Sequence, residues 1–167
     1  MSDSNMVVFV GGWFSGALFG LKLHAKCPEW RITIAEPRQR LGRAVAYGAC
    51  DTAHLLNEPV SRMEVGLSPG FTDWLREHAD MIPEAAAEGG QDLSAACLPR
   101  RLFGDYIEER VNAVLDNRSL TGLSSVRGEV LRLLDSERGV LLNDGRKIRA
   151  GIVVLAMGNL PPPPGRP

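Results

Sequence analysis

The chain has 167 residues, of which 44% are hydrophobic and 23% are charged, and its formal net charge at pH 7 is −1. A chain of this length forms one domain with a sizeable core. The small net charge excludes an electrostatic argument for binding nucleic acid or an anionic membrane surface. Function therefore has to be sought in local motifs.

The three cysteines, Cys27, Cys50 and Cys97, are far apart and form no C-x-x-C pair. This spacing predicts neither a disulfide framework nor a zinc site, and it fits a reducing compartment. Residues 6–21 are apolar, but no positive charge precedes them and glycines interrupt them. They therefore lack the features of a signal peptide. We expect a soluble, cytoplasmic protein with no metal and with neither nucleic acid nor membrane as a partner.

The first structural motif is a short apolar run followed by a glycine-rich turn. Residues 7–10 (Val-Val-Phe-Val) predict a buried parallel strand. The turn 11–16 (Gly-Gly-Trp-Phe-Ser-Gly) comes next, and a helical apolar face follows it, made of Ala17, Leu18, Leu21 and Ala25. The first N–H groups of a helix have no internal partner, and the helix dipole favours an anion there. This motif predicts a site for the pyrophosphate of a dinucleotide.

A second predicted strand covers residues 31–36 and ends in Glu36. An acid about twenty residues beyond the glycine turn is placed to accept a hydrogen bond from a ribose hydroxyl. The alternative is an acid that ends a strand in solvent. Pro37 then stops the strand, and Arg38, Arg40 and Arg43 follow around Gly42. This stretch is either a backbone that passes close to phosphates or an ordinary surface loop.

The middle of the chain predicts helices at about 71–78 and 101–116. Their aromatic and aliphatic residues recur at helical spacing, which is typical of a core. We interpret Tyr106 as a packing residue and His54 as a structural histidine. Since no nucleophile lies in a pattern with a base, the sequence identifies no catalytic residue.

The last third predicts strands. Residues 124–134 alternate loosely around Gly128, and an Asp144-Gly145 turn between 139–142 and 147–150 predicts a hairpin. A continuous apolar run at 152–156 predicts a second buried parallel strand, ending in Met-Gly-Asn. A parallel strand that ends in glycine beside the first strand is where an open α/β sheet binds its ligand.

Five segments together carry a resemblance to a known family. They are V-V-F-V-G-G-W-F-S-G (7–16), I-A-E-P-R-Q-R-L-G-R-A-V-A-Y (34–47), H-L-L-N-E-P-V-S-R-M (54–63), P-R-R-L-F-G-D-Y (99–106) and the pair D-G-R-K-I-R-A and I-V-V-L-A-M-G-N (144–159). They resemble, in order, the FAD/NAD(P)-binding flavoproteins with two dinucleotide folds, and among these a bacterial group described as FAD/NAD(P)-binding proteins. The resemblance covers nearly the whole chain.

The resemblance implies FAD as the cofactor and a role for each matching residue. The turn glycines would face the pyrophosphate, Glu36 would hold the adenosine ribose, Val130 would meet the adenine through its backbone, and Asn57 would lie near the flavin. The predicted cofactor-binding set is Gly11, Gly12, Trp13, Phe14, Ser15, Gly16, Glu36, Pro37, Arg38, Gly42, Arg43, Asn57, Val130, Ala156, Met157 and Gly158.

The chain departs from the family pattern at several places. Trp13 and Ala44 stand where the family has glycine, and Met157 replaces a threonine. Family members also run on for several hundred residues, into the part that carries the nicotinamide-nucleotide site. We therefore expect an N-terminal portion that uses NAD(P)H only together with that missing part.

The predicted fold is a Rossmann-like FAD-binding domain over 1–167, with a helical insertion at 55–120 and a late β-meander. Three functions follow. The first is the FAD-binding portion of a flavin-dependent oxidoreductase of the monooxygenase type. The second is a non-catalytic remnant, or a subunit of a split flavoprotein, with weak or no FAD binding. The third is an NAD-binding dehydrogenase, because Glu36 suits NAD equally well; the late hairpin favours FAD. A sheet that lacks its last strand predicts self-association or a second polypeptide as partner.

Overall fold

The computed structural model describes residues 3–48, 53–84, 92–117, 122–135 and 138–158. The chain forms two compact units: Met1–Gly42 with Val111–Pro167, and Arg43–Arg110. The first unit contains all of the strands in the described residues and the helix α1. The second unit is helical.

A four-stranded parallel sheet forms the centre of the first unit, in the order β3-β2-β1-β7. Its strands are β1 (Met6–Val10), β2 (Arg31–Glu36), β3 (Leu123–Arg127) and β7 (Ile152–Leu155). Val7 pairs with Ile32 on one side and with Ile152 on the other. The carboxyl ends of β1, β2 and β7 therefore lie along one edge of the sheet, as the sequence predicts for a ligand-binding α/β sheet.

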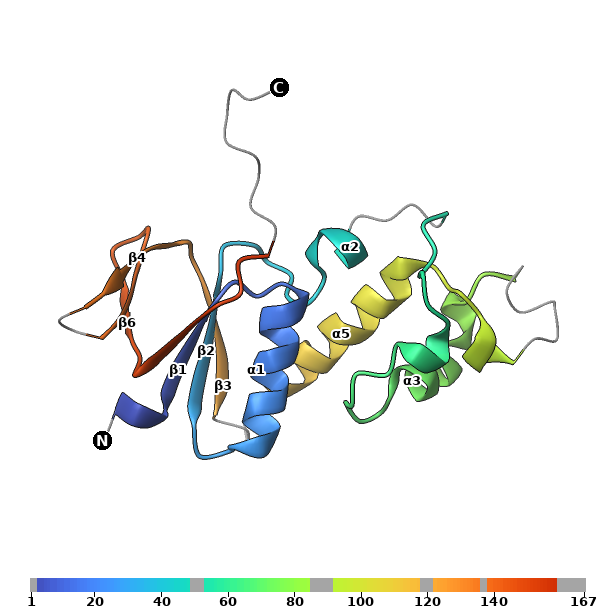
Figure 1. The fold of residues 1–167 in the computed structure, drawn as a ribbon, viewed down its shortest axis with the longest axis horizontal. Helices are drawn as coiled ribbons and strands as arrows, with labels where there is room; N and C mark the ends of the chain where they lie inside the picture. Colours follow the sequence, from blue (N-terminus) through green and yellow to red (C-terminus); the bar gives the residue numbers. More distant parts are fainter. Residues whose placement is uncertain (1–2, 49–52, 85–91, 118–121, 136–137, 159–167) are drawn as a thin grey trace, which may run out of the picture. The chain divides into compact units, whose positions relative to one another are not determined.

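Each face of this sheet is covered by a different layer (Figure 1). Helix α1 (Phe14–Lys26) covers one face, where the rings of Phe9 and Phe19 meet edge to face with centroids 5.4 Å apart. An antiparallel sheet packs on the other face; it consists of β4 (Val130–Leu134), β5 (Gly139–Leu142) and β6 (Lys147–Arg149). Val8 and Val10 of β1 share a core with Val140 and Leu142 of this second sheet. Burial on both faces explains the continuous apolar run of β1.

The prediction of a buried last strand is wrong in part. Strand β7 does pair in parallel with β1, but 41% of Ile152 and 58% of Leu155 are exposed. The physical reason is the strand's place in the sheet: β7 is at its edge, and in the described part of the chain only β1 pairs with it.

The second unit contains α2 (Ala44–Gly48), α3 (Phe71–Glu77) and most of α5 (Arg100–Leu115), with short 3-10 turns at Val60–Arg62, Ala79–Met81 and Leu93–Ala95. Its core is aromatic: Phe71 and Phe103 meet edge to face, with centroids 5.0 Å apart, and Trp74 and Tyr106 are also buried. The predicted helices at 71–78 and 101–116 are confirmed to within one residue at each end. Most of these elements fall inside 55–120, but the single domain with an insertion stays a prediction.

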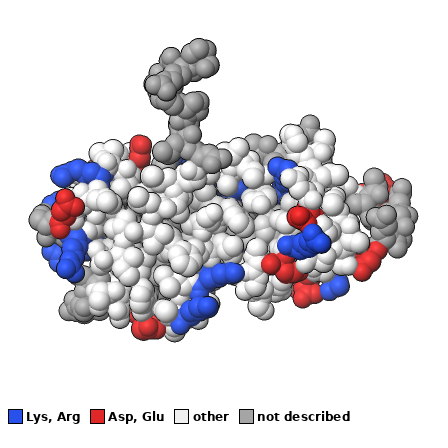
Figure 2. All heavy atoms as spheres, in the orientation of Figure 1, with Lys and Arg blue, Asp and Glu red and all other residues white. Residues whose placement is uncertain are grey.

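The surface carries charges of both signs. Figure 2 shows one face, on which lysine and arginine side chains and aspartate and glutamate side chains both occur among large uncharged areas. Among the described residues, no helix has the length and apolarity needed to cross a membrane.

Candidate dinucleotide site

The glycine turn is held between the ends of two strands. Gly11 has φ +105°, and a Cβ added there would lie 2.4 Å from the carbonyl oxygen of Ala156. Its N–H donates to the carbonyl of Ala35 over 2.9 Å, while the N–H of Ala156 donates to the carbonyl of Val10 over 2.8 Å. Only glycine fits this position, because it lacks a Cβ and tolerates positive φ.

The next two glycines bring α1 close to the turn. A Cβ at Gly16 would lie 2.0 Å from the carbonyl oxygen of Gly11, and a Cβ at Gly12 would lie 2.4 Å from the side chain of Leu41. The first turn of α1 therefore packs directly on the backbone of the glycine turn. Trp13 is the N-cap; its side chain accepts no hydrogen bond from the helix, and the first turn contains no acid. The first turn of α1 therefore contributes no acidic side chain to the positive end of the helix dipole, which favours an anion.

Glu36 is buried at the end of β2, with 3% of its surface exposed. Its Oε2 accepts the N–H of Gly12 over 2.8 Å, and its Oε1 accepts the N–H of Arg38 over 3.1 Å. The alternative of an acid in solvent is therefore wrong. The Oε1 of Glu36 also accepts Nη1 of Arg38 over 3.4 Å. A carboxylate has about four acceptor positions, so these bonds leave capacity for one further hydrogen bond, such as one from a ribose hydroxyl.

A pocket of about 130 Å³ opens beside this carboxylate, at the carboxyl ends of β2 and β3. Its lining residues are Glu36, Arg38, Gln39, Leu41, Asn112, Leu115, Ser125, Val126 and Arg127. Sequence reasoning missed the wall formed by Asn112, Ser125 and Arg127. The sequence signal for this wall is Gly128, which directly follows β3. That the end of β3 lies beside Glu36 follows only from the pairing of β3 with β2.

Trp13 contacts one residue after β2 and one after β7. The guanidinium carbon of Arg38 is 4.2 Å from the centroid of the indole. On the side of β7, a Cβ at Gly158 would lie 2.8 Å from the indole ring, and Gly158 has φ +66°. The indole thus contacts two predicted cofactor residues from different segments.

The remaining predicted residues of this unit lie around the same edge. Phe14 and Ser15 begin α1. The N–H of Gly42, which has φ +85°, donates to the carbonyl of Gly12 over 2.8 Å. The others are the exposed Pro37 after β2, the half-buried Ala156 and exposed Met157 after β7, and Val130 at the start of β4. Of the sixteen predicted residues, all but Arg43 and Asn57 belong to the first unit.

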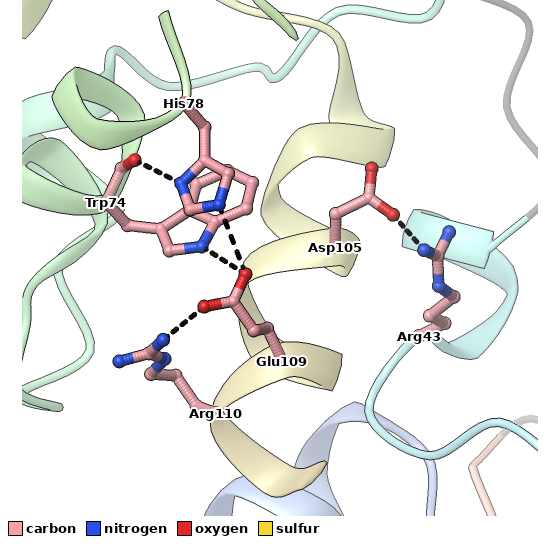
Figure 3. A network of polar contacts seen from close by, with 6 residues as sticks. All are labelled: Arg43, Trp74, His78, Asp105, Glu109 and Arg110. Carbon is pink, nitrogen blue, oxygen red and sulfur yellow. Dashed lines mark hydrogen bonds and ion pairs between the residues drawn. The ribbon is translucent and has the colours of Figure 1, made fainter. Parts of the chain in front are cut away.

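Arg43 and Asn57 belong to the second unit and have partners there. The guanidinium of Arg43 donates to Asp105 and to Glu108 of α5 (Figure 3 shows the Asp105 contact). The Oδ1 of Asn57 accepts Nη2 of Arg100 over 2.7 Å. The role of both residues toward a dinucleotide stays a prediction.

Polar side chains beside the aromatic core of the second unit form a network around Glu109 (Figure 3). Glu109 accepts Nε1 of Trp74 over 2.8 Å and a bond from Arg110, and Nε2 of His78 lies 3.5 Å away. Burial acts to raise the pKa of Glu109, but the hydrogen bonds from Trp74 and Arg110 outweigh it and the pKa is lowered.

Tyr106 behaves as the packing residue that the sequence indicates. Its hydroxyl donates to the carbonyl of Pro69 over 2.9 Å, and burial, helped by the charge of Glu64, raises its pKa to about 12. A group with that pKa is a poor general acid or base at neutral pH. Among the described residues, no group of three or more His, Cys, Asp or Glu side chains could hold a metal ion.

The chain was compared with known proteins. A family model described as FAD-NAD(P)-binding matches residues 8–160. No curated protein matches the chain. Among solved structures, the closed form of cyclohexanone monooxygenase is 21% identical with a TM-score of 0.59, and the match covers 96% of this chain and 28% of that one.

Two further structures share the fold. The Diels-Alderase PyrE3 of pyrroindomycin biosynthesis is 15% identical with a TM-score of 0.56, covering 92% of this chain and 32% of that one. The PF1083 protein of Pyrococcus furiosus is 11% identical with a TM-score of 0.50, covering 92% and 59%. The chain thus spans less than two thirds of each structure. Since the family model covers most of its length, this chain belongs to the FAD-NAD(P)-binding family.

Proposed function

We propose that this chain binds FAD as the nucleotide-binding part of a flavin-dependent oxidoreductase. The observation that carries the proposal is the buried carboxylate of Glu36, which is bonded to the glycine turn and opens onto a pocket at the carboxyl edge of the sheet. The pocket would bind the adenosine, and Glu36 would accept a hydrogen bond from the ribose. The start of α1 would bind the pyrophosphate.

The chain's contribution would be binding and orientation. The flavin supplies the redox chemistry when it is bound. Gly11 and Gly16 hold the turn against β7 and α1 by contacts that no side chain could replace. Glu36 fixes the same turn through the N–H of Gly12. The backbone of the glycine turn is thus held in place before the ligand arrives, which reduces the entropy lost on binding.

Glu36 suits NAD and FAD equally well, but two other features support FAD. The first is the E-P-R…L-G-R segment after β2, which resembles the flavoproteins. The second is the antiparallel sheet β4-β5-β6, which corresponds to the late meander of that resemblance. The fold shared with cyclohexanone monooxygenase makes monooxygenase chemistry the first to test. Use of NAD(P)H would need a site outside this chain.

The test is a titration of the purified chain with FAD and with NAD, followed by flavin fluorescence and by calorimetry. Glu36→Ala should weaken FAD binding by about 1.5–3 kcal/mol, the range for hydrogen bonds to a charged group. Glu29→Ala, an exposed acid of the same unit, is the matched control and should bind as the parent does. Equal FAD affinity of parent and Glu36→Ala would refute the ribose role, and preference for NAD would favour the dehydrogenase.

A second candidate is a subunit of a split flavoprotein, and the exposed β7 favours it. An edge strand with exposed Ile152 and Leu155 is open to pairing with a further strand. We expect self-association or capture of a second polypeptide that completes the sheet. Light scattering at micromolar concentration measures this, and a monomer that unfolds cooperatively would contradict it.

A further inference from the structure

The side chain of Trp13 links the two ends of the predicted pyrophosphate site. Family members have glycine at this position so that the backbone can approach the phosphates. Here the indole lies under the guanidinium of Arg38, at 4.2 Å, and against the backbone of Gly158. Arg38 is itself bound to Glu36, since its Nη1 lies 3.4 Å from Oε1. Contacts therefore run without a break from the end of β2 to the end of β7.

Gly158 and Arg38 both accommodate the indole of Trp13. Gly158 has no side chain, and a Cβ there would come within 2.8 Å of the ring. Trp13 has φ −70°, a backbone conformation open to any residue, so no strain drives the indole from this position. Arg38 covers the ring with a cation, which the negative face of an aromatic ring attracts.

The adenosine part of the site is not covered in this way. The pocket beside Glu36 is lined by residues of β2, β3, α5 and the segment after β2, and Trp13 is not among them. The two parts of the site therefore differ in their surroundings: the ribose carboxylate lies beside a cavity, while the indole of the N-cap residue lies between Arg38 and Gly158.

Resting on the proposed function, we infer that Trp13 closes the pyrophosphate part of the site, so that it disfavours adenine dinucleotides but not adenosine. Adenosine carries no phosphate and needs only the pocket and Glu36. A dinucleotide must first displace the indole from Arg38 and Gly158, and this lowers its affinity.

The experiment compares adenosine, ADP-ribose and FAD by calorimetry on three proteins: the parent, Trp13→Ala and Trp30→Ala. Trp30→Ala is the control, because it removes a half-buried indole from the same unit at a distant loop. We expect Trp13→Ala to bind ADP-ribose and FAD at least tenfold more tightly than the parent and to bind adenosine within twofold of it. Trp30→Ala should match the parent for all three ligands.

The outcomes separate this inference from the proposed function. If adenosine binds the parent and Trp13→Ala equally, and FAD does too, the closure by Trp13 is wrong and the adenosine site stands. If Trp13→Ala binds FAD more weakly, the indole is a contact for the ligand, which also overturns the closure. If neither protein binds any of the three ligands, the proposed nucleotide site itself fails.

A second measurement does not depend on truncating Trp13. In a Trp30→Phe protein, Trp13 and Trp74 are the tryptophans that remain, and Trp74 is only 1% exposed. Quenching by acrylamide then reports mainly on Trp13. Saturation with ADP-ribose should increase the quenching, and saturation with adenosine should leave it unchanged. Unchanged quenching with bound ADP-ribose would contradict displacement of the indole.

Discussion

The two units differ in what their buried and partly buried acids bind. In the second unit, the partly buried Asp105 and Glu108 bind the guanidinium of Arg43, and Glu109 binds the indole N–H of Trp74 and Arg110. These partners are side chains of the same unit. In the first unit, the buried Glu36 binds two backbone N–H groups and lies beside a pocket. The kind of partner and an adjoining cavity therefore distinguish Glu36 from the acids of the second unit.

The largest effect that tests this difference is expected from Arg43→Met. Removing the guanidinium leaves Asp105 and Glu108 without their shared cation in a largely buried place, and loss of one partner of a buried ion pair costs about 3–5 kcal/mol. Urea unfolding measures the loss. Arg62→Met is the control, since Arg62 pairs with Glu58 at the surface, and it should change the stability by less than about 1 kcal/mol.

The same Arg43→Met variant also tests whether Arg43 belongs to the cofactor site. The resemblance assigns it to the dinucleotide, whereas its contacts in the structure are with α5. If Arg43→Met unfolded like the parent but bound FAD more weakly, the residue would belong to the cofactor site instead of the core of the second unit.

A smaller loss is expected from Gly16→Ala in the first unit. The new Cβ would meet the carbonyl of Gly11 at 2.0 Å, and a clash with backbone has to move α1 or the glycine turn. We expect destabilisation by about 2–3 kcal/mol, at the upper end for overpacking, together with weaker nucleotide binding.

The control for Gly16→Ala is in the same helix. A Cβ at Gly20 would meet side chains instead of backbone: the end of Ile34 at 3.1 Å and Leu123 at 3.8 Å. Alanine also favours a helix over glycine by about 0.5–1 kcal/mol. Gly20→Ala should therefore leave stability nearly unchanged. Equal losses in the two variants would mean that the close approach at Gly16 does not hold the turn.

The smallest expected effect is a gain in stability from a substitution in the second unit. Ala44 has φ +52°, a left-handed conformation that costs a residue with a Cβ about 1–2 kcal/mol. Ala44→Gly should stabilise the chain by about 1 kcal/mol, which a shift of the urea midpoint measures. Ala46→Gly, in the same short helix, should instead destabilise it, because glycine there only adds freedom to the unfolded chain. A loss in both variants would contradict the strain at Ala44.

Much of the first unit could be predicted from the sequence because its signals are local. The apolar run of β1, the glycines of the turn and the acid at the end of β2 lie within residues 6–36, and each has a direct backbone or packing reason. The hairpin β5-β6 was equally local, since an Asp-Gly turn joins its strands.

The rest of the site depends on contacts between distant parts of the chain. Thr33 and Ser124 meet across β2 and β3 with their hydroxyls 3.2 Å apart, although 91 residues separate them in the sequence. That pairing brings Arg127 beside Glu36 and forms a wall of the pocket. The exposure of β7 and the partners of Arg43 are likewise properties of the assembled structure, which hydrophobic pattern alone does not contain.

The contacts that run from Glu36 through Arg38 and Trp13 to Gly158 have a consequence for the kinetics of ligand binding. If the indole must leave before a pyrophosphate enters, opening precedes binding, and the observed association rate of a dinucleotide reaches a ceiling as its concentration rises. Adenosine, which carries no phosphate and enters beside Glu36, would show no such ceiling and would associate in proportion to its concentration. A tryptophan in place of a glycine would then give these two ligands different association kinetics at one site.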